Sequence, residues 1–159
     1  MKNKLPLSIV TPADVTDCLS DLSQYQKSVQ NNHLVHKVGG ATKPAVTELS
    51  QPAIDLLGVG EKLPTNEDII QAMDYLAALH KQPLVLHLTV VAELPLKGQV
   101  AIAEWFRDSC HPEALLSFSV NSQIGGGIKV RTPYHLHDYS YASQLEANKK
   151  DLIKELARV

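Results

Sequence analysis

The 159-residue sequence has only two cysteines, few aromatic residues and no long hydrophobic run. Cys18 and Cys110 lie far apart in the chain and show no metal-ligand spacing, so we expect free, inert thiols in a reducing compartment. Aromatic residues make up 5% of the chain, and the core is therefore expected to be mostly aliphatic. The longest apolar stretch, residues 84–92, is far shorter than the roughly 20 residues that cross a bilayer, which argues against a transmembrane helix.

A strong charge of either sign is also missing. The formal net charge is −2 and the pI is about 6.4, whereas nucleic-acid binders usually present a basic face, so no nucleic-acid partner is expected. Residues 5–10 are too short an apolar stretch for a secretory signal, and we expect the protein to stay in the compartment where it is made. Its 44% hydrophobic and 20% charged residues are typical of a soluble globular protein with one domain or two small ones.

Three segments of the N-terminal half combine helical hydrophobic spacing with capping residues. A serine or threonine precedes each segment and can accept a hydrogen bond from N–H groups of the first turn. The segments are residues 12–31, 51–57 and 66–80. None of them can bury its apolar stripe alone, so residues 1–82 are expected to form a small helical bundle.

The hydrophobic pattern changes from helical to alternating in the C-terminal half. Residues 84–91 are apolar on most of both faces, which is typical of a central strand covered by helices. Residues 99–108 predict a helix. Residues 116–120 and 128–131 alternate between apolar and polar side chains on either side of three glycines, residues 125–127. These two strands are expected to pair as a hairpin in a small antiparallel sheet.

A short third strand is expected around Leu136, and after it the pattern becomes helical again. Leu145, Leu152 and Leu156 fall on one side of this last helix. Residues 83–159 thus predict the order strand, helix, hairpin, helix, with two helices covering one sheet. The predicted fold class is α+β, with a small N-terminal helical bundle followed by a C-terminal α/β domain that carries the glycine-rich hairpin.

An ordered set of residues links the strand region to the last helix. Its members are Gly125, Gly126, Arg131, Asp138, Ser140 and Leu145. The set resembles the C-terminal signature of the delta subunit of rotary ATP synthases, whose mitochondrial relative is the oligomycin-sensitivity-conferring protein. The resemblance covers residues 84–156. It departs from the family pattern at Val91, where the family has serine, and at Tyr139, where the family usually has glycine.

The resemblance implies a non-catalytic connector of a bacterial, proton-translocating ATP synthase, with no cofactor. The C-terminal half would bind the b-type subunit of the peripheral stalk, and the N-terminal helices would contact the alpha subunits of the catalytic head. The protein would be cytoplasmic, peripheral to the inner (plasma) membrane through the complex, and not itself inserted in the membrane. The family also has six N-terminal helices, whereas the periodicity of this chain predicts three.

Other interpretations of the same residues are weaker. The glycines could cradle a phosphate, but such a loop normally opens a helix, and here strands flank it. A turn, or the close approach of a helix to the sheet, is the favoured explanation. Asp138 and Ser140 have no partnered base in the sequence, so Ser140 is predicted to cap the last helix, and no catalytic residue is predicted.

A second class of function stays open, namely a stand-alone α/β module that binds a small ligand or a metal. His135 and His137 would share one face of a strand, as in a metal site. A third ligand would have to come from His87, His111 or a carboxylate, and no spacing indicates one. We therefore predict no metal site. The basic residues of the last helix fit either a solvated face or a helix that docks on a stalk.

Overall fold

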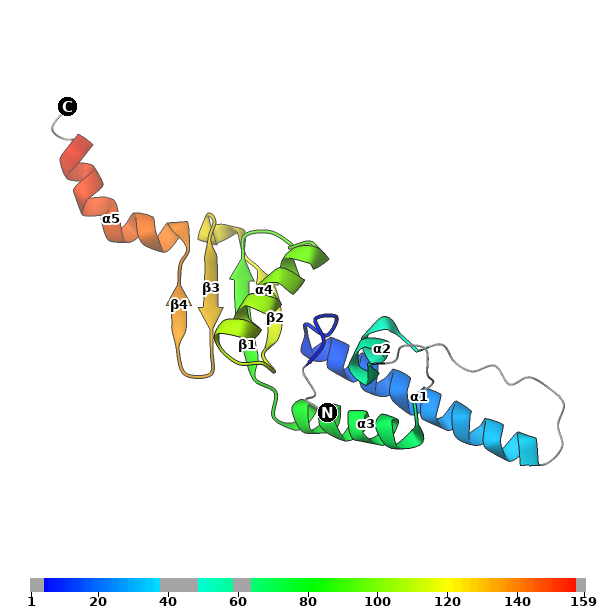
Figure 1. Cartoon of the computed structure of the whole chain (residues 1–159). Helices are drawn as coiled ribbons and strands as arrows, with labels where there is room; N and C mark the ends of the chain where they lie inside the picture. The colour runs from blue at the N-terminus through cyan, green and yellow to red at the C-terminus, as the bar shows by residue number, and fades with distance from the viewer. Residues whose placement is uncertain (1–4, 38–48, 59–63, 157–159) are drawn as a thin grey trace.

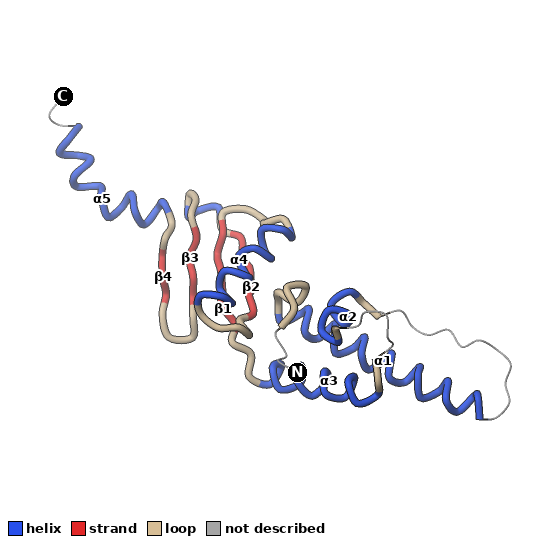
Figure 2. Tube along the Cα trace, viewed as in Figure 1, coloured by secondary structure: helices blue, strands red, loops and turns tan. Residues whose placement is uncertain are grey.

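The computed structural model describes residues 5–37, 49–58 and 64–156. In chain order the helices and strands are α1 (Pro12–Lys37), α2 (Gln51–Leu57), α3 (Asn66–Lys81), β1 (Val85–Val90), α4 (Leu96–Ser109), β2 (Leu115–Val120), η1 (Ser122–Ile124), β3 (Ile128–Arg131), β4 (Leu136–Asp138) and α5 (Tyr141–Leu156). Three helices precede a region of strands and helices, which confirms the α+β class (Figures 1 and 2).

The three predicted N-terminal helices are confirmed, and local signals set most of their ends. Thr65 and Asp68 form a capping box at the start of α3, in which each side chain binds the other residue's N–H group. Gly58 ends α2 in the left-handed conformation (φ 61°). Helix α1 continues to Lys37 instead of ending near residue 31, because no glycine or proline interrupts the sequence before Gly39.

These helices share one aliphatic core with the first residue of β2. Its buried members are Leu5, Ile9, Val15, Cys18, Leu22, Ala53, Ala72, Leu76, Leu79 and Leu115. Cys18 and Cys110 are both free, and burial raises the pKa of the Cys18 thiol to about 11, with a smaller contribution from the Asp21 charge. The resemblance implies six helices in this half, whereas the described residues before Pro83 contain three.

The sheet is mixed, and its strand order is β2-β1-β3-β4. Strand β1 pairs in parallel with β2, and the β1–β3 and β3–β4 pairs are antiparallel. The prediction that β1 is central is confirmed. The predicted hairpin between the strands on either side of the glycines is wrong, because β1 lies between β2 and β3. The helical crossover α4 lets β2 run parallel to β1, and the glycine segment then carries the chain to the other side of β1.

One helix covers one face of the sheet. Ala103 and Phe106 of α4 pack against buried residues of three strands, among them Leu88, Leu116 and Val130. Helix α4 begins at Leu96, directly after Pro95, and not at Gln99 as predicted. The prediction that the last helix also covers the sheet is wrong. Helix α5 starts beside the edge strand β4 and extends away from the sheet, with residues 141–149 exposed (Figure 1).

The residues before α1 connect the two halves. The Leu116 N–H group donates a hydrogen bond to the Val10 carbonyl (2.9 Å), and the buried Arg107 side chain donates to carbonyl groups of the same N-terminal segment. The division into residues 1–82 and 83–159 stays a prediction. None of the described helices is both long enough and apolar enough to span a membrane.

Candidate docking surface at the C-terminal helix

Asp138, the last residue of β4, makes two bonds that position the start of α5. Its Oδ2 atom pairs with the Lys129 ammonium of β3 (2.8 Å), and its Oδ1 atom accepts a hydrogen bond from the Ser140 N–H group (2.9 Å). The bond from Lys129, and then those from Ser140, lower the pKa of Asp138 to about 2 because they favour the ionised carboxylate. At neutral pH Asp138 is therefore an anion that joins β3 to the start of α5.

Ser140 is fully buried and caps α5. Its Oγ atom accepts a hydrogen bond from the Ser143 N–H group (3.3 Å), and its carbonyl oxygen accepts one from the Gln144 N–H group (3.1 Å). The bond to Gln144 is the first regular bond of the helix, and the bond to Ser143 gives one N–H group of the first turn a partner that the helix itself does not supply. The structure thus shows the capping role predicted for this serine.

Gly126 and Gly127 allow the root of α5 to lie against the loop that follows η1. The Tyr141 N–H group donates to the Gly126 carbonyl (3.0 Å), and a Cβ atom at Gly126 would lie 2.5 Å from the Tyr141 ring. A Cβ atom at Gly127 would collide with the Tyr139 carbonyl oxygen. Close approach, and not a hairpin, is therefore what these glycines provide. The segment leads into strand β3 and opens no helix, unlike a phosphate-binding loop.

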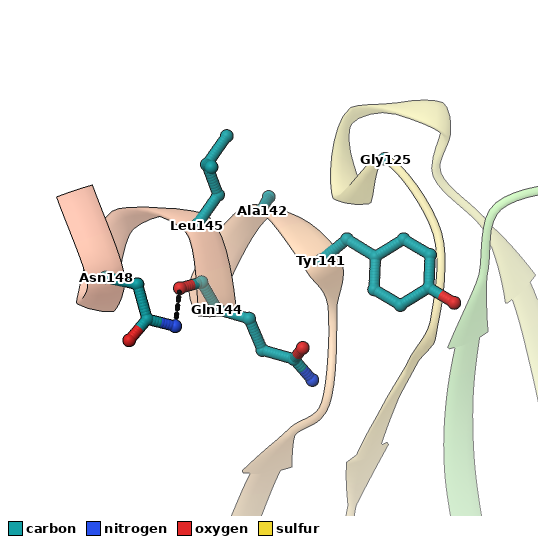
Figure 3. Close-up of a pocket in the computed structure, with 6 residues that line it drawn as sticks. All are labelled: Gly125, Tyr141, Ala142, Gln144, Leu145 and Asn148. Atoms are coloured by element: carbon teal, nitrogen blue, oxygen red, sulfur yellow. Dashed lines mark hydrogen bonds between the residues drawn. The ribbon is translucent and has the colours of Figure 1, made fainter. Parts of the chain in front are cut away.

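A shallow cavity of about 580 Å³ lies between this loop and the exposed side of α5. Its lining residues are Gly125, Tyr141, Ala142, Gln144, Leu145 and Asn148 (Figure 3). The Tyr141 ring lies beside the glycine loop, whereas Leu145 stands free on the helix and is 63% exposed. Tyr141 is also more than half exposed and lines the same cavity one helical turn away, so the two side chains form an apolar patch that is a candidate for a protein contact.

Of the six residues in the motif, five gather around the start of α5. They are Gly125, Gly126, Asp138, Ser140 and Leu145. Arg131 does not join them, because it lies at the opposite end of β3, directly across from His87 of β1. The motif therefore combines a structural joint for α5 with one residue of a different surface.

The paired histidines lie on the exposed edge of the sheet. The ring centroids of His135 and His137 are 6.1 Å apart, and His137 stacks on Tyr139 with an angle of 8° between the rings. Within the described ranges, no three histidine, cysteine or acidic side chains gather as metal ligands would. The metal-binding alternative thus has two imidazoles and no third ligand in this part of the chain.

Two residues of the site were missed in the sequence. Lys129 neutralises Asp138, and Tyr141 packs on Gly126. Strand alternation could have placed Lys129 on one face of β3, but the pairing of β3 with β4 that brings it to Asp138 is not readable from a local pattern. Tyr141 directly follows the capping serine, and its position in the first turn was the available signal.

Comparison of the sequence with known families gives a match. Residues 9–152, from before α1 to the last turns of α5, match the family described as ATP synthase delta (OSCP) subunit. No individual curated protein matches the chain in a direct sequence comparison. The family match includes the N-terminal helices, which the motif resemblance did not reach. The chain belongs to the ATP synthase delta (OSCP) subunit family.

Proposed function

We propose that this chain links the catalytic head of a bacterial, proton-translocating ATP synthase to the peripheral stalk and catalyses no reaction itself. The ATP synthase delta (OSCP) family consists of peripheral-stalk subunits, so the place in the stalk follows from membership. Such a connector must resist torque while the rotor turns. It does so through long-lived contacts between helices, which require no cofactor.

The exposed apolar side of α5 is the observation that supports the stalk contact. Tyr141, Leu145 and Ile153 are each more than half exposed on this helix, which extends away from the sheet. Tyr141 and Leu145 are one helical turn apart and form a continuous apolar surface. A helix of the b-type stalk subunit that covers this side would remove apolar area from water at about 25 cal/mol per Å².

The head contact is assigned to the N-terminal helices. Residues 12–31 and 66–80 lie in α1 and α3, which pack together and offer their outer surfaces to the N-terminal segments of the alpha subunits. In this arrangement the protein is cytoplasmic and reaches the inner (plasma) membrane only through the complex. It neither inserts into the membrane nor binds nucleic acid.

Binding of the soluble part of the b-type stalk subunit to the full chain tests the proposal. Leu145→Asp places a charge in the middle of the apolar side of α5 and should weaken binding at least a hundredfold, because a charge buried in a contact loses its hydration. The fold should be unaffected, since Leu145 makes no core contact. Calorimetry and circular dichroism measure the two effects.

Ser143→Asp is the matched control. It introduces the same charge two residues away, on the opposite side of α5, where an acid in the first turn is favourable. Binding of the stalk subunit should remain within about twofold of wild type. Equal binding by both variants, or failure of the wild-type chain to associate with either stalk or head subunits, would contradict the proposed function.

A further inference from the structure

The sheet has a second face, which points away from α4 and carries polar side chains of β1 and β3. Strand register places His87 directly beside Arg131. Both residues alternate along their strands with Leu88 and Val130, which are buried under α4, so their side chains point to the other face. His87 and Arg131 are exposed there.

These two residues line a cavity of about 370 Å³, which we call the His87–Arg131 pocket. Val85 and Pro133 supply apolar walls, and Thr132 completes the lining. None of the described residues that line the pocket is acidic, so the Arg131 guanidinium gives it a positive charge. The pocket is distinct from the cavity at α5, with which it shares no lining residue.

The cation in this pocket is available for a ligand. On the same face Lys129 is neutralised by Asp138 at 2.8 Å. Across the described parts of the chain, no carboxylate forms an ion pair with Arg131. An arginine offers a planar fork of five N–H donors that fits a carboxylate with two parallel hydrogen bonds. A neighbouring imidazole adds a further donor.

We propose that the His87–Arg131 pocket binds a carboxylate side chain, from aspartate or glutamate, of the b-type stalk subunit. This inference rests on the proposed function, because the pocket lies on the same half of the chain as α5. A lining that combines the apolar Val85 and Pro133 with the Arg131 guanidinium suits the apolar stem and charged head of an acidic side chain. The stalk subunit is thus held at two separate points, one apolar and one ionic, which fixes its direction on the sheet.

The test measures calorimetric binding of the soluble b-type subunit to the full chain at low and high salt. Arg131→Met should weaken binding about tenfold at low salt and flatten the salt dependence, because the lost contact is ionic. Lys97→Met removes the same charge from the exposed surface of α4 and should leave binding within twofold. Arg131→Lys keeps the charge without the fork and should lie between these values.

The outcomes separate the pocket from the connector function. Binding by Arg131→Met that equals binding by Lys97→Met, with an unchanged salt dependence, overturns the pocket while the effect of Leu145→Asp keeps the function. A wild-type chain that does not bind the stalk subunit overturns both. Circular dichroism checks the fold of each variant. If Arg131→Met is unfolded, Arg131→Lys decides: wild-type affinity and salt dependence overturn the pocket, and weaker binding supports it.

Discussion

The three consecutive glycines between η1 and β3 differ in the space that a Cβ atom would have at each position. A Cβ atom at Gly125 would have no heavy atom within 4 Å, and one at Gly126 would meet the Tyr141 ring, a side chain that can rotate. A Cβ atom at Gly127 would meet backbone atoms of Tyr139 and Ser140, which the capped start of α5 holds in place. Gly127 is therefore the position at which glycine is required most strictly.

Gly127→Ala should destabilise the protein by about 3 kcal/mol, because it adds a steric collision to the cost of a positive φ angle (77°). Gly125→Ala has a similar φ angle (68°) without the collision and should cost about 1 kcal/mol. Urea unfolding of both variants measures the difference. Equal losses would show that the approach of α5 to the loop imposes no constraint of its own.

At the scale of elements, the Asp138 carboxylate joins β3, β4 and α5. Asp138 is the last residue of β4, and it binds Lys129 of β3 and Ser140, the residue that caps α5. The folded-state pKa of about 2 lies below the ordinary value of about 3.9. A carboxylate with a depressed pKa stabilises the fold at pH values above its unfolded pKa. That contribution is lost as the pH falls through the folded pKa.

Asp138→Asn should therefore lower Tm by a constant amount above about pH 5, and the gap to wild type should close between about pH 4 and pH 2. Thermal unfolding followed by circular dichroism measures the gap. Lys129→Met provides a second check, because removal of the ammonium should raise the pKa of Asp138 toward its ordinary value in an NMR titration. A gap that persists unchanged to pH 2 would contradict this account.

Elements whose ends depend on local chemistry were predictable from the sequence. The capping box at Thr65, the left-handed Gly58 and the serine cap of α5 each depend on residues within a few positions. Strand order was not predictable in this way, because β2 and β3 have the same alternating pattern whether they pair with each other or with β1. The hairpin prediction was wrong because it assumed that β2 and β3, which are close in sequence, are also neighbours in the sheet.

The candidate site shows the same limit. Gly125, Gly126, Asp138, Ser140 and Leu145 occur close together in sequence, and the structure gathers them at one joint. Arg131 lies beside His87 only because β1 pairs with β3, and this pairing joins distant parts of the chain. No local pattern predicts the His87–Arg131 pocket, because only the strand register creates it.

At the scale of the whole molecule, a buried arginine holds the helical half and the sheet half together. Arg107 of α4 is 4% exposed, and its guanidinium donates to the carbonyl oxygens of Pro6 (2.9 Å), Ala114 (3.1 Å) and Ile9. Burial lowers the pKa of Arg107, but the side chain stays charged at neutral pH. One cation thus fixes the segment before α1 to the strand region.

Arg107→Met should destabilise the protein by about 3 kcal/mol, because the buried bonds to the Ala114 and Ile9 carbonyl groups are lost and methionine supplies no donor. The part-buried Pro6 carbonyl also loses the arginine but keeps the Ile9 N–H group as a donor. Native-state hydrogen exchange should also accelerate at the Leu116 amide, whose bond to Val10 depends on the same segment. Arg107→Lys keeps a charge with fewer donors and should give an intermediate loss. If urea unfolding and exchange at Leu116 were unchanged in Arg107→Met, the Leu116–Val10 bond and apolar contacts such as those of Leu115 would unite the two halves without the arginine.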